Sequence, residues 1–182
     1  MTTTDVPAPS RPAAWKRIAL LAVLAAFAAF WVWALFFASK EAVNRIGDRA
    51  WAERAEEICA AANDEREALA DYTRIDQPTP DLIARRADVV DQATDVVATM
   101  LDEIMTVAPT DAKGAAIVPD WVADYRTYLD DRREYADELR VSGRNLAFYE
   151  SQVDGIPLSE KLETFAGDNA MPSCAPPRDL AQ

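Results

Sequence analysis

The sequence predicts an all-α protein, with one N-terminal transmembrane helix followed by an antiparallel three- to four-helix bundle. Residues 18–38 are 21 consecutive apolar residues without a charge. After them, apolar residues recur in steps of four and three, which is the helical period. No stretch alternates long enough to form a sheet. We therefore expect four parts: a cytoplasmic tail (1–17), a transmembrane anchor (18–38), an extracytoplasmic helical bundle (39–175) and a flexible tail (176–182).

The apolar run 18–38 has the length of a membrane span, since about 20 helical residues cross the hydrocarbon core. The alternative is a cleaved signal peptide, whose apolar region is about 7–15 residues long and ends at a small-x-small site. Here the run is longer, and bulky Phe36 lies three positions before a cut after Ala38. We expect an uncleaved anchor in the lipid bilayer.

Flanking charges predict how the anchor is oriented. Arg11, Lys16 and Arg17 precede the apolar run, whereas the residues after it carry mixed charges. The positive-inside rule then places the N-terminus in the cytoplasm and the C-terminal domain outside it, in the cell envelope.

One face of the anchor carries small residues at helical spacing: Ala19, Ala22, Ala26 and Ala29. Such a ridge lets another transmembrane helix approach closely, and it is a candidate for membrane packing with a partner protein. The alternative is that alanine is simply abundant in this chain.

The first helix outside the membrane is predicted from an apolar seam with one polar interruption, formed by Trp51, Ala55, Ile58, Ala62, Glu65, Leu69 and Tyr72. No proline lies between Trp15 and Tyr72 and Gly47 is the only glycine there, so we expect this helix to continue directly from the span. It should break near Pro78 and Pro80, because proline disfavours helix in the residue before it.

The second helix has a clear start signal, with Thr79 as N-cap, Pro80 at the first helical position and Asp81 in the first turn. The four-three spacing then predicts left-handed bundle packing through a seam of Ile83, Ala87, Val90, Thr94, Val97, Leu101 and Ile104. The helix should end before Pro109.

The third helix is expected to open at Pro119-Asp120 and to fray near Ser142-Gly143, with a possible extension over 145–153 after a kink. Its polar side should be a solvated charged surface, formed by Asp124, Asp130, Asp131, Arg132, Arg133, Glu134, Asp137 and Glu138. A short fourth helix, 159–165, should be capped by Ser159 and stopped by Gly167. The proline-rich tail should be irregular.

The apolar side of the third helix is aromatic, and it carries Trp121, Tyr125, Tyr128 and Tyr135. These side chains are candidates for an interaction surface or a ligand pocket, because aromatics are enriched at binding surfaces. The alternative is that they fill the core opposite the small alanines of the first helix.

The chain has two cysteines, Cys59 and Cys174. An even count in an oxidising compartment favours a disulfide, which would tie the tail to the first outer helix. Two unpaired, buried small side chains are the alternative. No C-x-x-C motif is present, so a redox-active pair is not expected.

Composition argues against most chemistry. The net charge is −12 and histidine is absent, which removes the usual general base and the commonest transition-metal ligand. The acidic balance disfavours nucleic-acid binding. Carboxylate clusters (Glu53, Glu56 and Glu57; Asp130, Asp131 and Glu134) lack a calcium-loop motif, and we expect solvated faces there. We predict no catalytic residue, cofactor or metal, and no enzyme activity.

The order of features is also familiar: an anchor, C-A-A-A-N at 59–63, a proline break, a helix led by Trp121 and a last cysteine at Cys174. Over residues 51–175 this resembles anchored helical envelope proteins of high-GC actinobacteria, which are generally uncharacterised. The resemblance implies a cell-envelope location and a disulfide. We expect an accessory or scaffolding subunit of a membrane complex. The alternative is an extracytoplasmic ligand-binding or sensory module that acts through a partner, since only about 17 residues remain inside.

Overall fold

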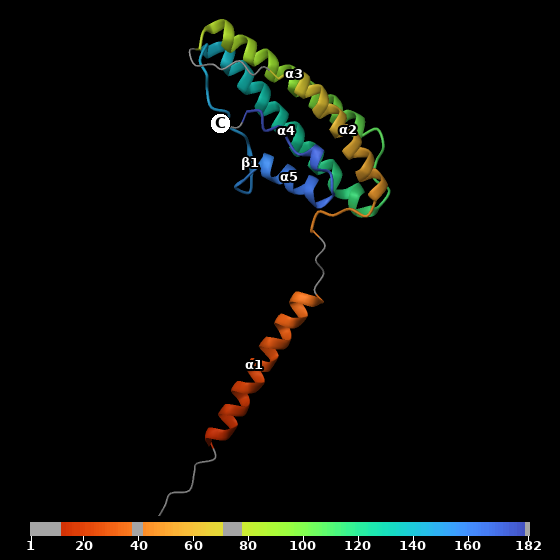
Figure 1. The fold of residues 1–182 in the computed structure, drawn as a ribbon, viewed down its shortest axis with the longest axis vertical. Coiled ribbons are helices and arrows are strands. Elements are labelled where there is room, and N and C mark those ends of the chain that lie inside the picture. The colour runs from red at the N-terminus through yellow and green to blue at the C-terminus, as the bar shows by residue number, and fades with distance from the viewer. Residues whose placement is uncertain (1–11, 38–41, 71–77, 181–182) are drawn as a thin grey trace, which may run out of the picture. The chain divides into compact units, whose positions relative to one another are not determined.

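A computed structural model describes residues 12–37, 42–70 and 78–180 of the chain (Figure 1). These residues are mostly helical, in the order α1, α2, α3, α4, a two-stranded hairpin, α5 and a short 3-10 turn, η1. The chain divides into two compact units, Met1–Glu41 and Ala42–Gln182. We describe the two units separately.

The first unit contains α1 (Pro12–Phe36). Among the described residues, its part Trp15–Phe36 is the one helix that is long and apolar enough to cross a membrane, with a mean hydropathy of 2.5. Residue 38 of the predicted span lies outside the described residues. The ridge alanines 22, 26 and 29 are exposed and Ala19 is half-exposed, so packing on a second helix stays a prediction.

In the second unit, α2 (Arg49–Ala68) does not continue from α1, contrary to our expectation. Residues 42–48 are non-helical because side chains bind their backbone. One side chain caps the N-terminus of α2, and another binds the segment that precedes it. The Asp48 carboxylate accepts a hydrogen bond from the Trp51 backbone N–H (3.0 Å), and Asn169 Oδ1 accepts one from the Ile46 N–H (2.9 Å). The buried face of α2 is formed by Trp51, Ala52, Ala55, Cys59 and Ala62; Ile58 and Leu69 are half-buried, Glu65 is exposed and Tyr72 lies outside the described residues.

Helix α3 (Pro80–Ile104) follows the prediction closely. Thr79 is the N-cap and accepts a hydrogen bond from the Leu82 N–H (3.4 Å). All seven residues of the predicted seam are buried. The four-three spacing therefore identified the packed face correctly.

Helix α4 (Ala112–Ser142) begins earlier than predicted and contains Pro119. Its N-cap is Asp111, which accepts a hydrogen bond from the Gly114 N–H (2.9 Å). A Cβ at Gly114 would lie 2.5 Å from an Asp111 carboxylate oxygen, so glycine permits this close approach. Pro119 has no N–H to donate to the Ala115 carbonyl, four residues earlier. Ala115 is exposed, so water can bind that carbonyl instead. The helix ends as predicted at Gly143 (φ 61°), and the extension over 145–153 is not formed.

Helices α3 and α4 pack along each other, and ion pairs line one side of their contact. Each pair joins an arginine of α4 to an aspartate of α3: Arg126 to Asp102 (3.1 Å), Arg133 to Asp95 (3.5 Å) and Arg140 to Asp88 (2.9 Å). The arginines ascend and the aspartates descend in steps of seven, which is two helical turns. The two helices are therefore antiparallel.

After α4, strands β1 (Gln152–Val153) and β2 (Ile156–Pro157) form a small antiparallel hairpin whose turn is Asp154-Gly155, both with positive φ. Helix α5 (Leu158–Asp168) follows, and η1 (Pro172–Cys174) is a single turn. The predicted cap by Ser159 is wrong, because Ser159 lies inside α5 and its N–H and hydroxyl both donate to Glu150 (2.6 and 2.7 Å). The helix also continues one residue past Gly167.

Residues 176–180, which we predicted as part of a flexible tail, pack against the domain. Pro176, Pro177 and Leu180 are buried. Leu180 joins a cluster with Ile83, Ala87, Val90, Tyr135, Ala136 and Leu139. Burial of these apolar groups stabilises the packed tail. Residues 181–182 lie outside the described residues.

Candidate functional site

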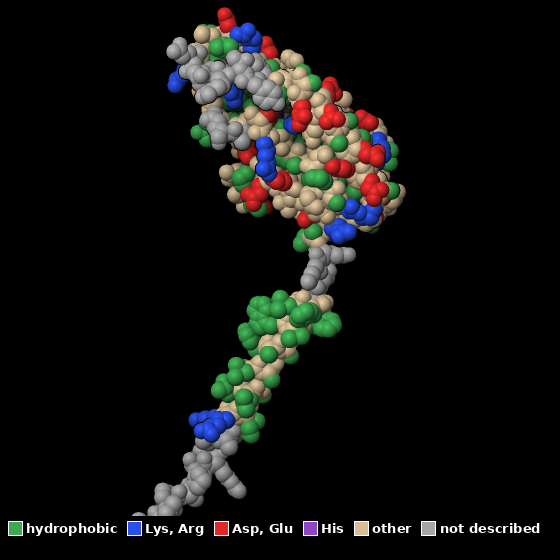
Figure 2. All heavy atoms as spheres, in the orientation of Figure 1, with side chains coloured by type: hydrophobic (Ala, Val, Ile, Leu, Met, Phe, Trp, Pro, Cys, Tyr) green, Lys and Arg blue, Asp and Glu red, His purple; other side chains and the backbone are tan. Residues whose placement is uncertain are grey.

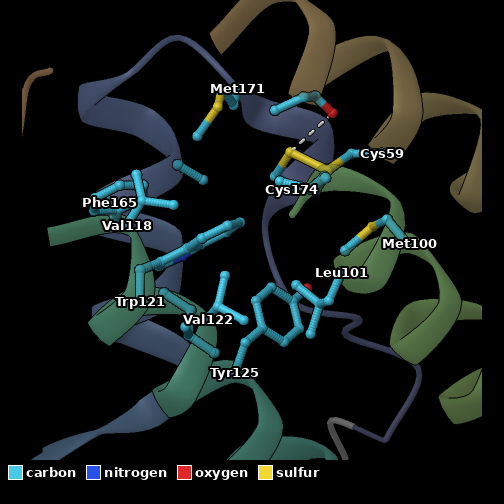
Figure 3. Close-up of a cluster of buried hydrophobic side chains, with 14 of the residues drawn as sticks. Cys59, Met100, Leu101, Val118, Trp121, Val122, Tyr125, Phe165, Met171 and Cys174 are labelled. Atoms are coloured by element: carbon cyan, nitrogen blue, oxygen red, sulfur yellow. Dashed lines mark hydrogen bonds between the residues drawn. A yellow bond between two sulfur atoms is a disulfide. The ribbon is translucent and has the colours of Figure 1, made fainter. Parts of the chain in front are cut away.

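The aromatic side chains singled out in the sequence lie in the core. Trp121, Tyr125, Tyr128 and Tyr135 are each exposed by 4% or less. The Trp121 ring stacks on Phe165 (centroids 5.0 Å apart) and meets Tyr125 edge-on at 5.6 Å (Figure 3). Burial raises the pKa of the Tyr125 hydroxyl, so that phenol stays neutral.

Ring contacts continue along α4 through the loop after it. Tyr125 meets Tyr128 at 6.3 Å, and Phe148 lies edge-on to both Tyr128 (5.9 Å) and Tyr135 (5.6 Å). Edge-to-face contacts of this kind add to the stabilisation from burial. The four side chains thus form a packed core and not an open aromatic groove. The filled core was the alternative to the predicted surface or pocket.

The two cysteines form the predicted disulfide. Cys59 of α2 and Cys174 of η1 are fully buried, with S–S at 2.06 Å and Cα–Cα at 5.1 Å. Figure 3 shows the bond beside Met100, Leu101 and Met171. The disulfide joins positions 115 residues apart and fixes the tail to α2.

An ion pair between a buried arginine and a partly exposed aspartate is the main feature that sequence reasoning missed. Arg132, expected on the solvated face of α4, is fully buried. Its guanidinium donates two hydrogen bonds to Asp179 (2.7 and 2.9 Å) and its Nε donates one to Thr94 Oγ1 (3.0 Å). The Tyr128 hydroxyl donates to the Pro177 carbonyl beside it (3.0 Å). The ion pair and this hydrogen bond therefore hold the C-terminal tail against α4.

Electrostatics of this pair favour the charged forms. Burial raises the pKa of Asp179, but the hydrogen bonds and charge of Arg132 outweigh it, and the net pKa is lowered. Burial likewise acts to lower the pKa of Arg132, and Asp179 reverses the direction. A planar guanidinium that meets a carboxylate with two hydrogen bonds has the geometry for this compensation.

Several carboxylates expected to be solvated also hold loops. Glu56 accepts from the Ser173 N–H (2.9 Å) and hydroxyl (2.7 Å), and Asp131 does the same for Ser151 (2.7 and 2.8 Å). Asp130 instead pairs with Arg133 on the surface. Among the residues described, no group of three or more acidic or cysteine side chains lies close enough to hold a metal ion.

Among the described residues, two hollows on the surface of the second unit are candidates for a ligand site. The smaller, about 250 Å³, lies between the tail and the loop after α4 and is lined by Tyr128, Ala147, Phe148, Glu150, Ser159, Pro177, Arg178 and Leu180. The larger, about 660 Å³, is a more open hollow at the C-terminal end of α4, lined by Glu134, Asp137, Glu138, Val141, Ser142 and Leu146. Small-molecule sites are usually enclosed apolar clefts of about 300–1,000 Å³, so neither hollow has both the size and the enclosure of such a site.

Sequence reasoning thus found the disulfide, gave the aromatic core as the alternative to a pocket, and missed the Arg132–Asp179 pair, whose partners are 47 residues apart. One signal in the sequence was available. Arg126, Arg133 and Arg140 recur every seven residues, and Arg132 lies one position outside that series, on a different face of the helix. No protein-family model, curated protein or solved structure matches the chain.

Proposed function

We propose that this chain is a non-enzymatic, single-pass membrane protein of the cell envelope that serves as an accessory or scaffolding subunit of a larger membrane complex. The observation that carries this proposal is the filled interior of the second unit. The aromatic side chains on the buried face of α4 contact one another or Phe165 and Phe148, and the buried Arg132 is paired with Asp179. The surfaces available for function are therefore the outside of the domain and the anchor.

The topology is part of the proposal. We place the N-terminus in the cytoplasm and the domain outside, with the domain folded as an antiparallel three- to four-helix bundle. The disulfide supports an oxidising compartment, where such bonds persist. The opposite directions of α3 and α4, and the packing of α2 on α3 and α5 on α4, support the bundle.

The test is capture of partners by the tagged full-length chain from its own membranes in a gentle detergent. A second chain carries an unrelated anchor in place of residues 18–38. We expect the native chain to bring down a defined membrane complex and the swapped chain to lose it. Failure of both chains to capture anything reproducible would contradict the subunit role.

Two further variants sharpen the test. Ala22→Leu with Ala26→Leu adds bulk to the alanine ridge, and Ala28→Leu with Ala34→Leu adds the same bulk to other faces of α1. Small residues permit close helix approach, so only the first pair should release the complex. Equal capture by both variants would show that the ridge is not the contact.

A second candidate is an extracytoplasmic ligand-binding or sensory module that acts through a partner. The hollow beside Tyr128 favours it, because this side chain was among the predicted pocket residues. Phe148 and Leu180 offer apolar contact there, while Glu150 and Arg178 offer charge. A small-molecule screen by thermal shift, with Phe148→Ala as the comparison, tests this role: a hit whose shift vanishes in the variant would support it.

A further inference from the structure

The end of the domain at which the chain enters differs from the rest of its surface. We call it the junction face and define it as residues 42–49, 104–113 and 167–171. Hydrogen bonds join the three segments: Thr110 donates to Asp48, and Asn44 donates to Asp168 (3.0 Å). The face therefore belongs to one connected structure.

Charge distinguishes this face. Residues 42–182 carry a net charge of −14, yet the junction face has three acidic and three basic residues and is neutral. Figure 2 shows Lys and Arg side chains gathered at the end of the domain where α2 begins, and Asp and Glu spread over its flank. The excess negative charge is thus carried by the other surfaces.

The acidic groups of the junction face accept hydrogen bonds within the domain, whereas two of its cations have no ion-pair partner in the part of the chain that the structure describes. Asp48 accepts from Trp51 and Thr110, Asp111 accepts from the Gly114 and Asp48 N–H groups, and Asp168 accepts from Asn44. Exposed Arg45 and Lys113 have no ion-pair partner among the described residues. The third cation, Arg49, donates to the Asn169 carbonyl (3.0 Å).

Apolar groups stand beside these free cations. Val43 is 85% exposed and Val107 is 49% exposed. Ala108 and Ala112 are exposed near them. A surface with free cations, exposed valines and no free carboxylate is complementary to a lipid headgroup region that carries negative charge.

Chain length limits where this face can go. Six peptide links join Phe36, the last residue of α1, to Ala42. A fully extended chain spans at most about 3.6 Å per residue, so this connection reaches about 22 Å at most. If α1 spans a bilayer, this connection keeps the junction face within reach of the lipid headgroups.

We propose that the junction face docks on an anionic lipid surface, with Arg45 and Lys113 contacting headgroups and the acidic flank held away from the bilayer. This inference rests on the proposed anchoring by α1. Each cation near an anionic surface shifts the docking equilibrium about fivefold, so removal of both should lower the docked fraction relative to the undocked one about thirtyfold.

The test uses the full chain, one copy per nanodisc, with a fluorophore on Val107→Cys and nitroxide-labelled lipid headgroups as quenchers. Discs contain either phosphatidylcholine alone or roughly one third phosphatidylglycerol. We expect strong quenching in the anionic discs, reduced by high salt, because salt screens exposed charges. A fluorophore on Val141→Cys, which is 90% exposed and lies at the opposite end of α4, should stay bright.

Matched charge variants separate recognition from simple proximity. Arg45→Gln with Lys113→Gln should abolish the lipid-dependent quenching, whereas Arg85→Gln with Arg144→Gln removes two exposed cations elsewhere and should not. Quenching that is equal in both disc types and unchanged in the first variant would overturn the proposal. So would quenching that needs two copies per disc, since a second chain would then cover the face.

Carbonate extraction of the same chain distinguishes failure here from failure of the anchor. A chain that stays in the membrane but shows no quenching refutes the docking proposal alone. A chain that is extracted refutes the anchoring and the docking proposal together.

Discussion

Replacing Asp179 by asparagine should destabilise the domain more than removing its partner, because the two members of the pair differ in burial. The Arg132 side chain is fully buried and that of Asp179 is 42% exposed. The change Asp179→Asn leaves a buried guanidinium without its counter-charge. The change Arg132→Met leaves a carboxylate that water can reach, and the methionine follows the path of the arginine stem.

The magnitude follows from that geometry. Breaking a buried pair by removal of one member costs about 3–5 kcal/mol. Exposure of Asp179 screens part of the attraction, so we expect Asp179→Asn to cost about 2–3 kcal/mol. In Arg132→Met, Thr94 still donates to the Val90 carbonyl (2.7 Å), so no buried hydrogen-bonding group loses its only partner. That variant should cost about 1 kcal/mol or less.

Urea unfolding of the full-length chain in one detergent, followed by far-UV circular dichroism, measures both losses in the free energy of unfolding. The control is Arg178→Gln, which breaks the exposed pair with Glu163 next to the same tail; the two side chains are 74% and 51% exposed. It should change the free energy of unfolding by less than about 1 kcal/mol. A larger loss for Arg132→Met than for Asp179→Asn would refute the argument from burial.

Three other outcomes are expected. The double change Cys59→Ala with Cys174→Ala should lower the free energy of unfolding by about 2–5 kcal/mol, since the bond closes a long loop; an unchanged urea midpoint would contradict this. Trp51→Phe should cost about 1 kcal/mol more than Trp121→Phe, because the Trp51 indole N–H donates a hydrogen bond (2.8 Å) and that of Trp121 has no partner among the described residues; equal unfolding free energies would contradict it. Hydrogen bonds from Thr110 lower the pKa of Asp48 to about 2, so the stability that this carboxylate contributes is present above the unfolded pKa of 3.8 and is lost as the pH falls toward 2. Asp48→Asn should therefore flatten the decrease in unfolding free energy between these pH values. An unchanged slope would argue against it.

The features that sequence reasoning recovered depend on local or compositional signals. The seam of α3 was correct because the apolar spacing and the Thr79-Pro80 start lie within one segment. The disulfide followed from an even cysteine count and an inferred compartment. Neither inference required knowledge of how distant segments meet.

Two of the errors arose where a tertiary contact decided the local structure, and a third arose from a local cap that was not recognised. The start of α4 was misplaced because Asp111 forms a cap that Pro119 does not prevent. The break before α2 depends on Asn169, which is 123 residues from the Ile46 N–H that it binds. Arg132 was placed on the solvated face because its counter-charge lies in a tail that composition marked as irregular. None of these contacts leaves a periodic signal.

Some of the acidic side chains hold the fold together, which a count of charges does not reveal. At four places in the described part of the chain, one carboxylate accepts both the backbone N–H and the hydroxyl of a serine or threonine: Asp48 with Thr110, Asp131 with Ser151, Glu150 with Ser159 and Glu56 with Ser173. Each contact fixes a connection between helices or the start of one, and charge-assisted bonds of this kind are the stronger ones.

This division determines how a search for the partner should be designed. Neutralising Glu56 removes one contact that holds η1 beside α2, next to the disulfide and the hydrogen bond from Asn63 to the Ser173 carbonyl, so loss of binding in that variant could report a local change at η1. The neighbouring carboxylates of Glu53 and Glu57 are exposed and have no such bond among the described residues. Substitution of Glu53 and Glu57 changes the surface charge of α2 and leaves the contacts of the fold in place. A partner that recognises the acidic surface of α2 should bind more weakly after substitution of Glu53 and Glu57. A partner that recognises only the transmembrane anchor should bind as before.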